Sequence, residues 1–396
     1  MAELTPLDDA LAIMLSCAQP LEAEDVPIEH AHNRILAAPV VAAIASPRSD
    51  SSAMDGYAVR DADVVELPAK LTVAGESFAG TAEPPSLGAE EAVRIFTGAP
   101  VPAEADRVVI QENCSREGDI VTVHEYGPGR HIRRAGHDFN EGQELLPAGA
   151  FLSARALVAA AGADQAVVGV VRRPRVAILG TGDELAPPGK ARHKPGSIPE
   201  SISFALAAMI TEAGGEVVRR AHSPDDMALL SNVAQNALAH ADLVVVTGGA
   251  SVGERDYARD MFGDELTLLF SKVAMKPGKP VWFGRHGRVL VLGLPGNPTS
   301  AIVTARLFLT PLVAGLAGQQ PSDKLNWTTG VAGAVVPANG ARETLVRGKW
   351  VEDRLAPLDS QDSSSQSALV DAEVLIRREI GAIEVMPGES LTYLDF

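Results

Sequence analysis

Between residues 175 and 317 the sequence alternates between short apolar runs and helical stretches. The apolar runs are RVAILG, EVVRRAH, DLVVVTGG and RVLVLGLPG, and helix-forming stretches such as SFALAAMITEAGG and DDMALLSNVAQNALAHA separate them. This alternation is typical of βαβ units, in which a helix crosses back over the sheet after each strand. We therefore predict an α/β domain here, with a mostly parallel sheet and helices on both faces.

The sequence on either side of this region predicts β structure. Residues 36–136 contain short alternating runs such as RVVIQEN and DIVTVHEY, and the last 75 or so residues contain TLVRGKW and SLTYLDF. We expect a compact β domain before the α/β domain and a small β unit after it. At the N-terminus a helix is predicted, with Thr5 as N-cap and Asp8 closing a capping box.

Composition excludes several classes of protein. The formal net charge is −17 and the chain has no dense basic run, which argues against general affinity for nucleic acid. No segment approaches the roughly 20 uninterrupted apolar residues of a membrane span. The start of the chain lacks the basic residues of a secretory signal, so we expect a cytoplasmic protein. Cys17 and Cys114 do not have the spacing of a zinc site or a disulfide framework.

Four loops follow the predicted strands of the α/β domain. Ligands of such sheets bind beyond the carboxyl ends of the strands, where glycines let backbone N–H groups approach a phosphate. These loops cover residues 180–184, 223–226, 247–251 and 295–298. A glycine pair after a strand is also common in a simple tight turn, but four such loops at one edge favour a ligand site.

Charged residues near these loops indicate what the ligand needs. Asp and Glu residues would repel a phosphate unless a divalent cation lay between them, and hard oxygen ligands suit Mg²⁺. The carboxylates concerned are Asp183, Glu184, Asp225, Asp226 and Asp256. Lys272, Lys276 and Lys279 in KVAMKPGK form a cationic cluster that either binds a small anion or is a solvated loop.

The usual nucleotide fingerprints are missing. GTGDEL lacks the third glycine of a dinucleotide site, and PGKP lacks the hydroxyl residue that follows the lysine of a P-loop. We therefore expect a phosphorylated ligand that is neither NAD nor a Walker-bound nucleotide.

Seven motifs, found in order along nearly the whole chain, carry a family resemblance. They are SSAMDGYAVR, FTGAPVP, AGHDFNEGQELLPAG, VAILGTGDEL, VVTGGASVGERDY, MKPGKP and GLPGNPTSA. This set resembles the molybdenum insertases, the family of MoeA and the gephyrin E domain. The resemblance implies a transferase of molybdenum cofactor biosynthesis, which inserts molybdate into adenylylated molybdopterin and releases AMP in a Mg²⁺-dependent step.

The resemblance also implies an architecture and partners. It implies a homodimer, with molybdopterin adenylyltransferase and apo-molybdoenzymes as further partners. Four domains are expected: a helical and extended linker domain (1–42 and 138–170), a β-rich insertion domain (43–137), an α/β molybdopterin-binding domain (171–318) and a C-terminal small β-barrel domain (319–396).

Motif by motif, the resemblance assigns roles to residues of this chain. The catalytic residues would be Asp55, Thr97, Glu184, Asp256, Lys272 and Lys276. The metal ligands would be Glu184, Asp225 and Asp256, with Asp226 as the alternative to Asp225. Together with the strand-end loops, it predicts substrate contacts from Asp138, Thr181, Gly182, Asp225, Asp226, Gly248, Gly249, Ser251, Lys279, Pro295, Asn297, Pro298, Arg347 and Ser363.

Two positions depart from the family pattern. Ile202 stands where the family usually has an Asn, near the expected pterin site, and Glu373 replaces the Asn of an Ala-Asn pair. A divergent paralogue that binds molybdopterin as a scaffold therefore stays open, as does a molybdopterin adenylyltransferase. The extra domains argue against the adenylyltransferase, while Asp256 and Lys276 favour catalysis.

Overall fold

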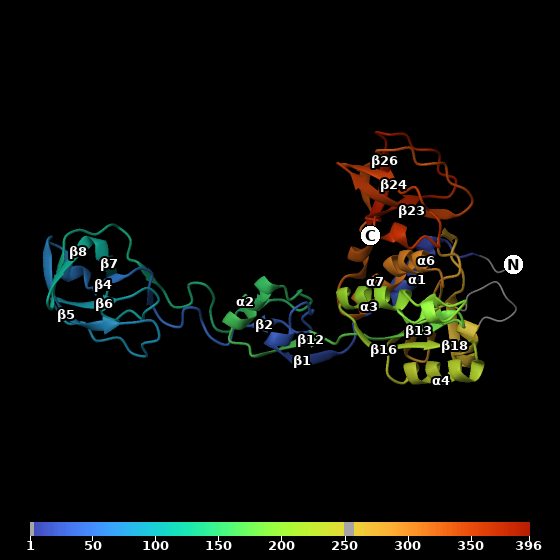
Figure 1. The fold of residues 1–396 in the computed structure, drawn as a ribbon. Coiled ribbons are helices and arrows are strands. Elements are labelled where there is room, and N and C mark those ends of the chain that lie inside the picture. Colours follow the sequence, from blue (N-terminus) through green and yellow to red (C-terminus); the bar gives the residue numbers. More distant parts are fainter. Residues whose placement is uncertain (1–3, 249–256) are drawn as a thin grey trace. The chain divides into compact units, whose positions relative to one another are not determined.

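The computed structural model describes residues 4–248 and 257–396 and divides the chain into two compact units (Figure 1). Unit 1 consists of Met1–Glu24, Asn33–Ile35 and Val170–Phe396. Unit 2 consists of Asp25–His32 and Leu36–Gly169.

Unit 1 contains a mixed six-stranded sheet. Its strands, in spatial order, are β16 (Glu216–Ser223), β13 (Arg175–Thr181), β17 (Leu243–Thr247), β21 (Val289–Leu294), β20 (Trp282–His286) and β18 (Leu266–Phe270). The first four strands are parallel, as the βαβ alternation predicts, and β20 is antiparallel to both of its neighbours, β21 and β18. Because β16 and β17 flank β13 on opposite sides, the strand order reverses at β13, where such sheets bind ligands.

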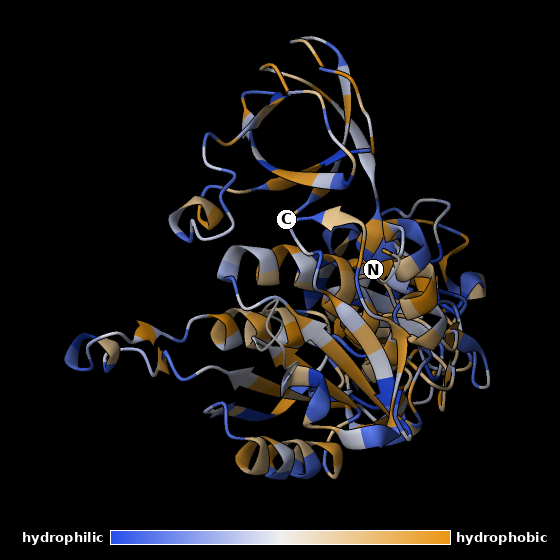
Figure 2. Cartoon of the chain, turned by 90° about the vertical axis from the view of Figure 1, so that its right-hand side faces the viewer, coloured by the Kyte–Doolittle hydropathy of each residue, from blue (hydrophilic) through white to orange (hydrophobic). Residues whose placement is uncertain are grey.

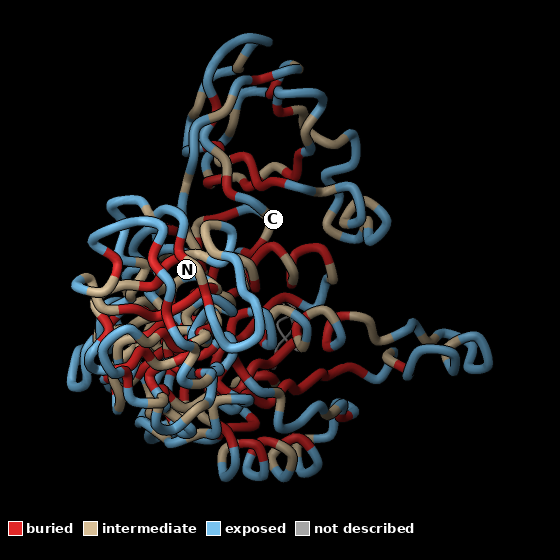
Figure 3. The backbone as a smooth tube through the Cα atoms, turned by 90° about the vertical axis from the view of Figure 1, so that its left-hand side faces the viewer, coloured by how far each residue is buried: buried red, intermediate tan, exposed pale blue. Residues whose placement is uncertain are grey.

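Helices cover both faces of this sheet. Along β13, Val176 and Ile178 face one apolar core, while Ala177 and Leu179 face the other. Figure 1 shows α4 on the opposite side of the sheet from α3 and α7, and Figure 3 shows how much of the backbone between these layers is buried. The helices are α1 (Leu7–Cys17), α3 (Ile202–Glu212), α6 (Pro298–Thr304) and α7 (Thr310–Leu316) on one side, and α4 (Met227–Leu238) and the short α5 (Tyr257–Asp260) on the other.

One helix of the described chain is long and apolar enough to cross a membrane. It runs over Pro298–Leu316, through α6, a π-helical turn and α7, and 83% of its apolar window is buried inside the protein. Figure 2 shows the apolar colour continuing from this helix layer into the strands beneath it. This segment is therefore the core helix of unit 1.

The start of the chain differs from the predicted capping box. α1 has Pro6 as its N-cap, with no side-chain cap hydrogen bond. Thr5 instead pairs through its backbone, since its N–H donates to Lys272 O (2.9 Å) and its carbonyl accepts from Ala274 N (2.8 Å). Asp8 accepts hydrogen bonds from Arg377 at 2.8 and 2.9 Å. The predicted cap is wrong because Thr5 and Asp8 form hydrogen bonds with distant parts of the chain instead of with the start of α1.

A second sheet lies in the C-terminal part of unit 1, where β structure is predicted. Its order is β19 (Met275–Lys276), β23 (Glu343–Val351), β25 (Val374–Arg378), β26 (Ser390–Asp395) and β22 (Thr328–Val331), with β24 (Arg354–Pro357) paired to β23. Leu345 and Leu375 pack into the helix-lined core of unit 1, whereas Val374 and Ile376 belong to a separate small core. Since β19 carries Lys276, this sheet is joined directly to the lysine segment.

Unit 2 is β-rich, as expected. Its main sheet has the order β7 (Arg107–Ile110), β4 (Gly56–Val59), β6 (Glu91–Ile95), β5 (Ala69–Ser77), β9 (Ile120–Val123) and β8 (Cys114–Glu117). Only the β5–β6 pair is parallel within this sheet, and it aligns Ser77 with Ile95. Smaller elements are β2 (Val40–Val41) with β11 (Glu144–Leu146), β3 (Ser51–Ser52) with β10 (Ile132–Arg133), and α2 (Ala154–Gly162). Strand β1 (Ala23–Pro27) pairs with β12 (Val167–Val171), and β14 (Leu185–Ala186) pairs with β15 (Ile198–Pro199) in unit 1.

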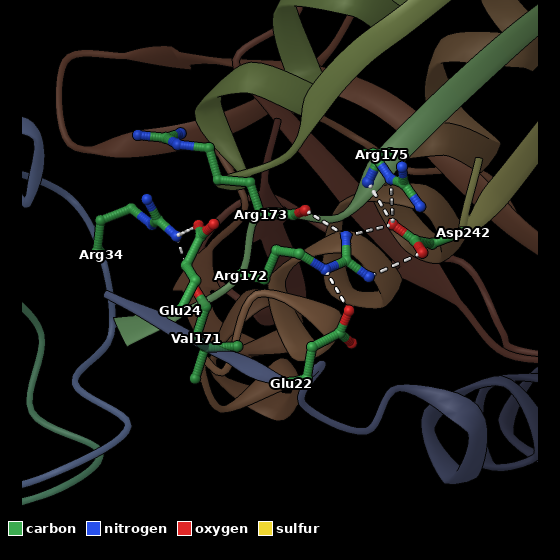
Figure 4. Close-up of polar contacts among 8 residues, drawn as sticks. All are labelled: Glu22, Glu24, Arg34, Val171, Arg172, Arg173, Arg175 and Asp242. Atoms are coloured by element: carbon green, nitrogen blue, oxygen red, sulfur yellow. Dashed lines mark hydrogen bonds and ion pairs between the residues drawn. The ribbon is translucent and has the colours of Figure 1, made fainter. Parts of the chain in front are cut away.

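A polar cluster centred on Arg172 fixes the amino end of the unit 1 sheet (Figure 4). Arg172 donates two hydrogen bonds to the Asp242 carboxylate, at 2.8 and 2.9 Å, and one to Glu22 at 2.6 Å. Asp242 also accepts from Arg175 N at 2.7 Å, which ties the starts of β13 and β17 together. Burial alone would raise the pKa of Asp242, but the bonds from Arg172 and Arg175 outweigh it and hold the pKa below its usual range.

We expect Asp242→Asn to destabilise unit 1 by about 2–3 kcal/mol at pH 7, because Arg172 loses an anionic hydrogen-bond partner. A lowered native pKa stabilises the fold above the unfolded-state pKa, and this contribution is lost as the pH falls through the native pKa. The difference from wild type should therefore shrink in acid.

Urea unfolding followed by tryptophan fluorescence measures this effect, because Trp282, Trp327 and Trp350 all lie in unit 1. Asp353→Asn is the matched control, since Asp353 is 90% exposed. Equal urea midpoints for Asp242→Asn and the control at pH 7 would contradict the assignment.

Candidate functional site

Three loops meet closely at the carboxyl edge of the unit 1 sheet. A Cβ atom added at Gly248, whose φ is +89°, would lie 2.5 Å from the carbonyl oxygen of Thr181. A Cβ added at Gly296 would lie 3.2 Å from the Cα of Gly248. Gly248 requires glycine, a Cβ at Gly296 would be tight, and the loops after β13, β17 and β21 are therefore in contact, as the parallel strands predict.

The predicted carboxylates of this edge separate into two roles. Asp226 is the N-cap of α4 and accepts from Leu229 N at 3.0 Å, so it supports the helix. Asp225 donates its backbone N–H to Asp183 Oδ1 at 3.1 Å. Burial, followed by the charges of Asp183 and Glu184, raises the pKa of Asp225. Of the two aspartates in this loop, Asp225 is the one that shares its surroundings with other carboxylates.

Part of the predicted metal and phosphate site cannot be placed. Gly249, Ser251 and Asp256 lie outside the described residues. Within residues 4–248 and 257–396, no group of three or more His, Cys, Asp or Glu side chains is arranged to hold a metal ion. The roles predicted for these three residues stay predictions.

A cleft of about 1030 Å³ in unit 1 is lined by three of the predicted cationic residues, Lys276, Lys279 and Arg347. Five of its lining residues are cationic and two are carboxylates, so a small anion would be attracted there. The charged lining residues are Lys276, Lys279, Arg342, Arg347, Arg378, Asp359 and Asp362, and Ser300, Gln361 and Ser363 also line it.

Arg347 is the most deeply placed of these cations, with 2% of its surface exposed. Its Nη2 donates to the carbonyl oxygens of Ser360 (3.0 Å) and Asp362 (3.2 Å). Its Nε and Nη1 are buried and have no hydrogen-bond partner within the described chain. Burial lowers the pKa of Arg347, and unpartnered buried N–H groups are costly, so a bound anion would compensate both.

The cleft is connected to the sheet edge through the loop that carries Ser363. Asn297 Nδ2 donates to Ser363 Oγ at 3.3 Å, and Thr299 Oγ1 donates to the carbonyl of Ser365 at 3.1 Å. Gln361 holds the same loop against β23, because it accepts from Arg347 N (3.0 Å) and donates to Arg347 O (2.8 Å). The predicted residues Asn297, Arg347 and Ser363 are thus brought together.

Not every predicted residue joins this group. Pro295 is buried where β21 ends, next to Gly296 and before Pro298 at the start of α6. Lys272 offers its carbonyl to Thr5 and is not among the residues that line the cleft. Asp138 is an exposed residue of unit 2 whose N–H donates to Ser46 O at 2.9 Å.

Asp55 and Thr97, which are 42 positions apart, form a pair in unit 2. Asp55 Oδ1 accepts from both the backbone N–H (2.7 Å) and the hydroxyl (2.8 Å) of Thr97. The β4–β6 pairing, which aligns Gly56 with Ile95, brings the two residues together. The two hydrogen bonds, the backbone one first, hold the pKa of Asp55 below its ordinary value. Asp55 therefore remains a carboxylate at lower pH than an ordinary Asp.

The departures from the family pattern have structural roles. Ile202 begins α3 with 9% exposure and belongs to the core of unit 1. Glu200 accepts from the N–H and hydroxyl of Ser203, at 2.8 and 2.7 Å, and so caps this helix start. Glu373 accepts from Trp350 N at 2.7 Å.

Sequence reasoning missed some lining residues. Gln361 and Asp362 adjoin the predicted Ser363, and only this closeness in sequence could have indicated that they line the cleft. Arg378 is 5% exposed, yet its segment LIRREI reads as an ordinary strand. Its place at the cleft follows from the pairing of Thr344 with both Lys276 and Arg378, which the sequence does not show.

We expect Thr97→Val to raise the pKa of Asp55 toward its ordinary value, because the substitution removes the hydroxyl donor and keeps the backbone N–H. Carbon NMR titration of the Asp55 carboxyl measures the change. Thr97→Ser, which keeps the hydroxyl, is the control and should titrate like wild type. If Thr97→Val also titrates like wild type, the hydroxyl does not hold Asp55 ionised.

Comparisons with known proteins cover almost the whole chain. Residues 5–163 match the family model described as MoeA N-terminal region (domain I and II), and residues 177–315 match a probable molybdopterin binding domain. The chain is 34% identical to the molybdopterin molybdenumtransferase of Haemophilus influenzae over 98% of each protein. It is 38% identical to molybdopterin molybdenumtransferase 2 of Mycobacterium tuberculosis over 76% of each.

A solved structure supports the same relationship. The molybdopterin biosynthesis MoeA protein of Pyrococcus horikoshii matches with a TM-score of 0.85 and 29% identity, over 99% of each chain. The resemblance carried by the seven motifs is thereby confirmed. On this evidence the chain belongs to the molybdopterin molybdenumtransferase family.

Proposed function

We propose that this protein is a transferase of molybdenum cofactor biosynthesis that inserts molybdate into adenylylated molybdopterin and releases AMP with the help of Mg²⁺. Its curated relatives carry the name molybdopterin molybdenumtransferase. The observation that carries the proposal for this chain is the cationic cleft, joined by Asn297 and Ser363 to the carboxyl edge of the α/β sheet.

The cleft is suited to the oxyanion substrate. Molybdate is a compact tetrahedral dianion, and a lysine ammonium acts on it as a point charge while an arginine supplies directed N–H donors. Lys276 and Lys279 are exposed at the cleft, and Arg347 has buried N–H groups without partners in the described chain. We assign molybdate to this group, with Ser363 as a further hydrogen-bond donor.

The sheet edge is suited to the phosphate and pterin parts of the other substrate. The close backbone approach at Thr181, Gly248 and Gly296 brings main-chain groups of these loops together, and neither glycine adds a side chain there. We assign the phosphate or the pterin to backbone N–H groups of this edge, as in other doubly wound sheets.

Magnesium fits the donors of the same edge. Mg²⁺ in phosphate sites usually binds one or two carboxylates together with substrate oxygens, so a three-residue protein cage is not required. Glu184 and Asp225 would hold it, and a bound cation would favour the ionised form of Asp225, whose pKa is raised by burial and then by the charges of Asp183 and Glu184. The ion would offset negative charge on the phosphoanhydride.

The chain's own residues then act by electrostatics and orientation. The lysines would hold molybdate and offset the charge that develops as a molybdate oxygen attacks the molybdopterin-side phosphorus of the phosphoanhydride. The new O–P bond forms as the P–O bond to AMP breaks, so AMP leaves with the electron pair and molybdate is left bonded to the molybdopterin phosphate. No side chain is needed as a covalent nucleophile. Asp55, kept ionised by Thr97, provides a fixed hydrogen-bond acceptor in unit 2.

The family resemblance extends this proposal to assembly and location. It supports a homodimer, a cytoplasmic protein, the four-domain division and a small C-terminal barrel, with molybdopterin adenylyltransferase and apo-molybdoenzymes as partners. Size-exclusion chromatography with light scattering tests the dimer directly.

We expect purified protein to release AMP from adenylylated molybdopterin only when molybdate is present, and to do so faster with Mg²⁺. Lys276→Ala should weaken the apparent affinity for molybdate about tenfold or more, because one charged contact is lost. Pterin affinity should change much less.

Lys349→Ala is the control for this experiment, because Lys349 is an exposed lysine of β23 that does not line the cleft. Loss of pterin affinity, with molybdate affinity intact, would show that the cleft binds a different ligand. Absence of AMP release from the wild-type protein would reject the proposed reaction.

A second test concerns the carboxylates. Asp183→Asn should lower the pKa of Asp225, because it removes a like charge and keeps the oxygen that accepts the Asp225 N–H. Adding Mg²⁺ to the wild-type protein should also lower the pKa of Asp225.

The raised native pKa of Asp225 means that its ionised form destabilises unit 1 at neutral pH, and this cost disappears as the pH falls through that pKa. NMR titration of Asp225 is the measurement, with Asp323→Asn as an exposed control; a pKa insensitive to Mg²⁺ would remove Asp225 as a ligand.

A further inference from the structure

Unit 2 carries an aromatic stack next to the Asp55–Thr97 pair. The rings of Phe78 and Phe96 are stacked, with centroids 4.8 Å apart and an interplanar angle of 11°. The Arg94 guanidinium lies over Phe96 (4.7 Å) and also over Tyr57 (5.1 Å). Phe78 is the outermost member and is 48% exposed.

The sheet explains why these residues meet. β5 and β6 are parallel and align Ser77 with Ile95, so Phe78 and Phe96 leave the two strand ends side by side. Arg94 is the cross-strand partner of Tyr57 on β4. Phe96 directly follows β6, and the Arg94 side chain from that strand lies over its ring. Thr97, which binds Asp55, directly follows Phe96.

Hydrogen bonds fix the positions of Arg94 and of the backbone at Phe78. Arg94 Nη1 donates to Gly56 O at 3.0 Å, and its Nη2 donates to Gln111 Oε1 at 2.7 Å. The Phe78 N–H donates to Thr81 Oγ1 at 3.0 Å, and the Thr81 N–H returns a bond to Phe78 O. A preorganised aromatic face costs little entropy when a flat ring stacks on it.

Charge selects which part of a substrate fits beside this stack. Both hydrogen bonds from Thr97 go to Oδ1 of Asp55, which leaves Oδ2 able to accept from a bound molecule. A carboxylate repels phosphate and favours N–H or O–H donors. Since the Arg94 cation and the Asp55 carboxylate both lie near the stack, a ligand part that is uncharged, planar and edged with donors would fit here, such as the amino edge of a nucleobase or the hydroxyls of its ribose.

We propose that Phe78, supported by Phe96 and Arg94, is a stacking subsite for a planar heteroaromatic ring, and that this ring is the adenine of the adenylylated substrate. The assignment to adenine rests on the proposed function, in which the substrate carries an adenylyl group. The pterin ring has the same stacking chemistry and is the alternative that the experiment distinguishes.

The experiment titrates the full-length protein with AMP, with ribose 5-phosphate and with pterin, using ligand-observed NMR. In the wild type, the adenine protons should shift upfield through the ring current of Phe78. Phe78→Ala should weaken AMP binding by about 5- to 150-fold, the range that corresponds to stacking of one base on an aromatic ring. Ribose 5-phosphate, which lacks the base, should bind both proteins equally.

Two further variants keep the result interpretable. Phe78→Trp preserves an aromatic face and should retain AMP affinity. Phe151→Ala removes another phenylalanine of unit 2 with nearly the same exposure, 47%, and should leave AMP affinity unchanged. Thermal unfolding of each variant shows whether the fold is intact.

Three outcomes would overturn the proposal: no saturable AMP binding by the wild type, unchanged AMP affinity in Phe78→Ala, or a loss of pterin affinity in place of AMP affinity. Molybdate-dependent AMP release is measured separately. If AMP binds through its base but no AMP is released, the proposed function is rejected and the stacking subsite is kept. If AMP is released but Phe78→Ala binds AMP as the wild type does, the subsite is rejected and the proposed function is kept.

Discussion

The close approach of three backbones at the carboxyl edge of the α/β sheet governs the geometry of the candidate site. Gly248 has no room for a side chain against Thr181, and a Cβ at Gly296 would make a tight contact with Gly248. These contacts bring the loops after β13, β17 and β21 together and set where α6 begins. Since Asn297 then meets Ser363, the position of the cationic cleft follows from the same contacts.

The two edges of this sheet have different tasks. At the amino edge, Arg172 is paired with both Asp242 and Glu22, and these ion pairs stabilise the fold of unit 1. At the carboxyl edge, burial and then the charges of Asp183 and Glu184 raise the pKa of Asp225, and no ion pair is seen for these three carboxylates within residues 4–248 and 257–396. In this part of the chain the carboxylates of the amino edge are paired with cations, whereas those of the carboxyl edge lie close to one another.

Several of these features could be predicted from sequence, because hydrophobic periodicity and loop chemistry are local. The alternation after residue 175 predicted the parallel strands, and the strand-end glycines predicted a ligand site at their carboxyl edge. Long-range pairing is not local: Phe78 meets Phe96 only through the parallel β5–β6 register, and Arg378 reaches the cleft only through Thr344. Thr5 shows that a local pattern can also mislead. Its sequence context predicts an N-cap, but its backbone N–H donates to Lys272 O.

The order of the segments in unit 1 has a consequence for its biosynthesis. α1 leaves the ribosome early, yet Leu7, Leu11 and Met14 belong to a core completed by Leu309 and Leu312. At roughly 5–20 residues per second, about 15–60 s separate the synthesis of these two parts. Unit 2 can fold during that interval because its own sheet is complete in the nascent chain, while the apolar face of α1 waits uncovered.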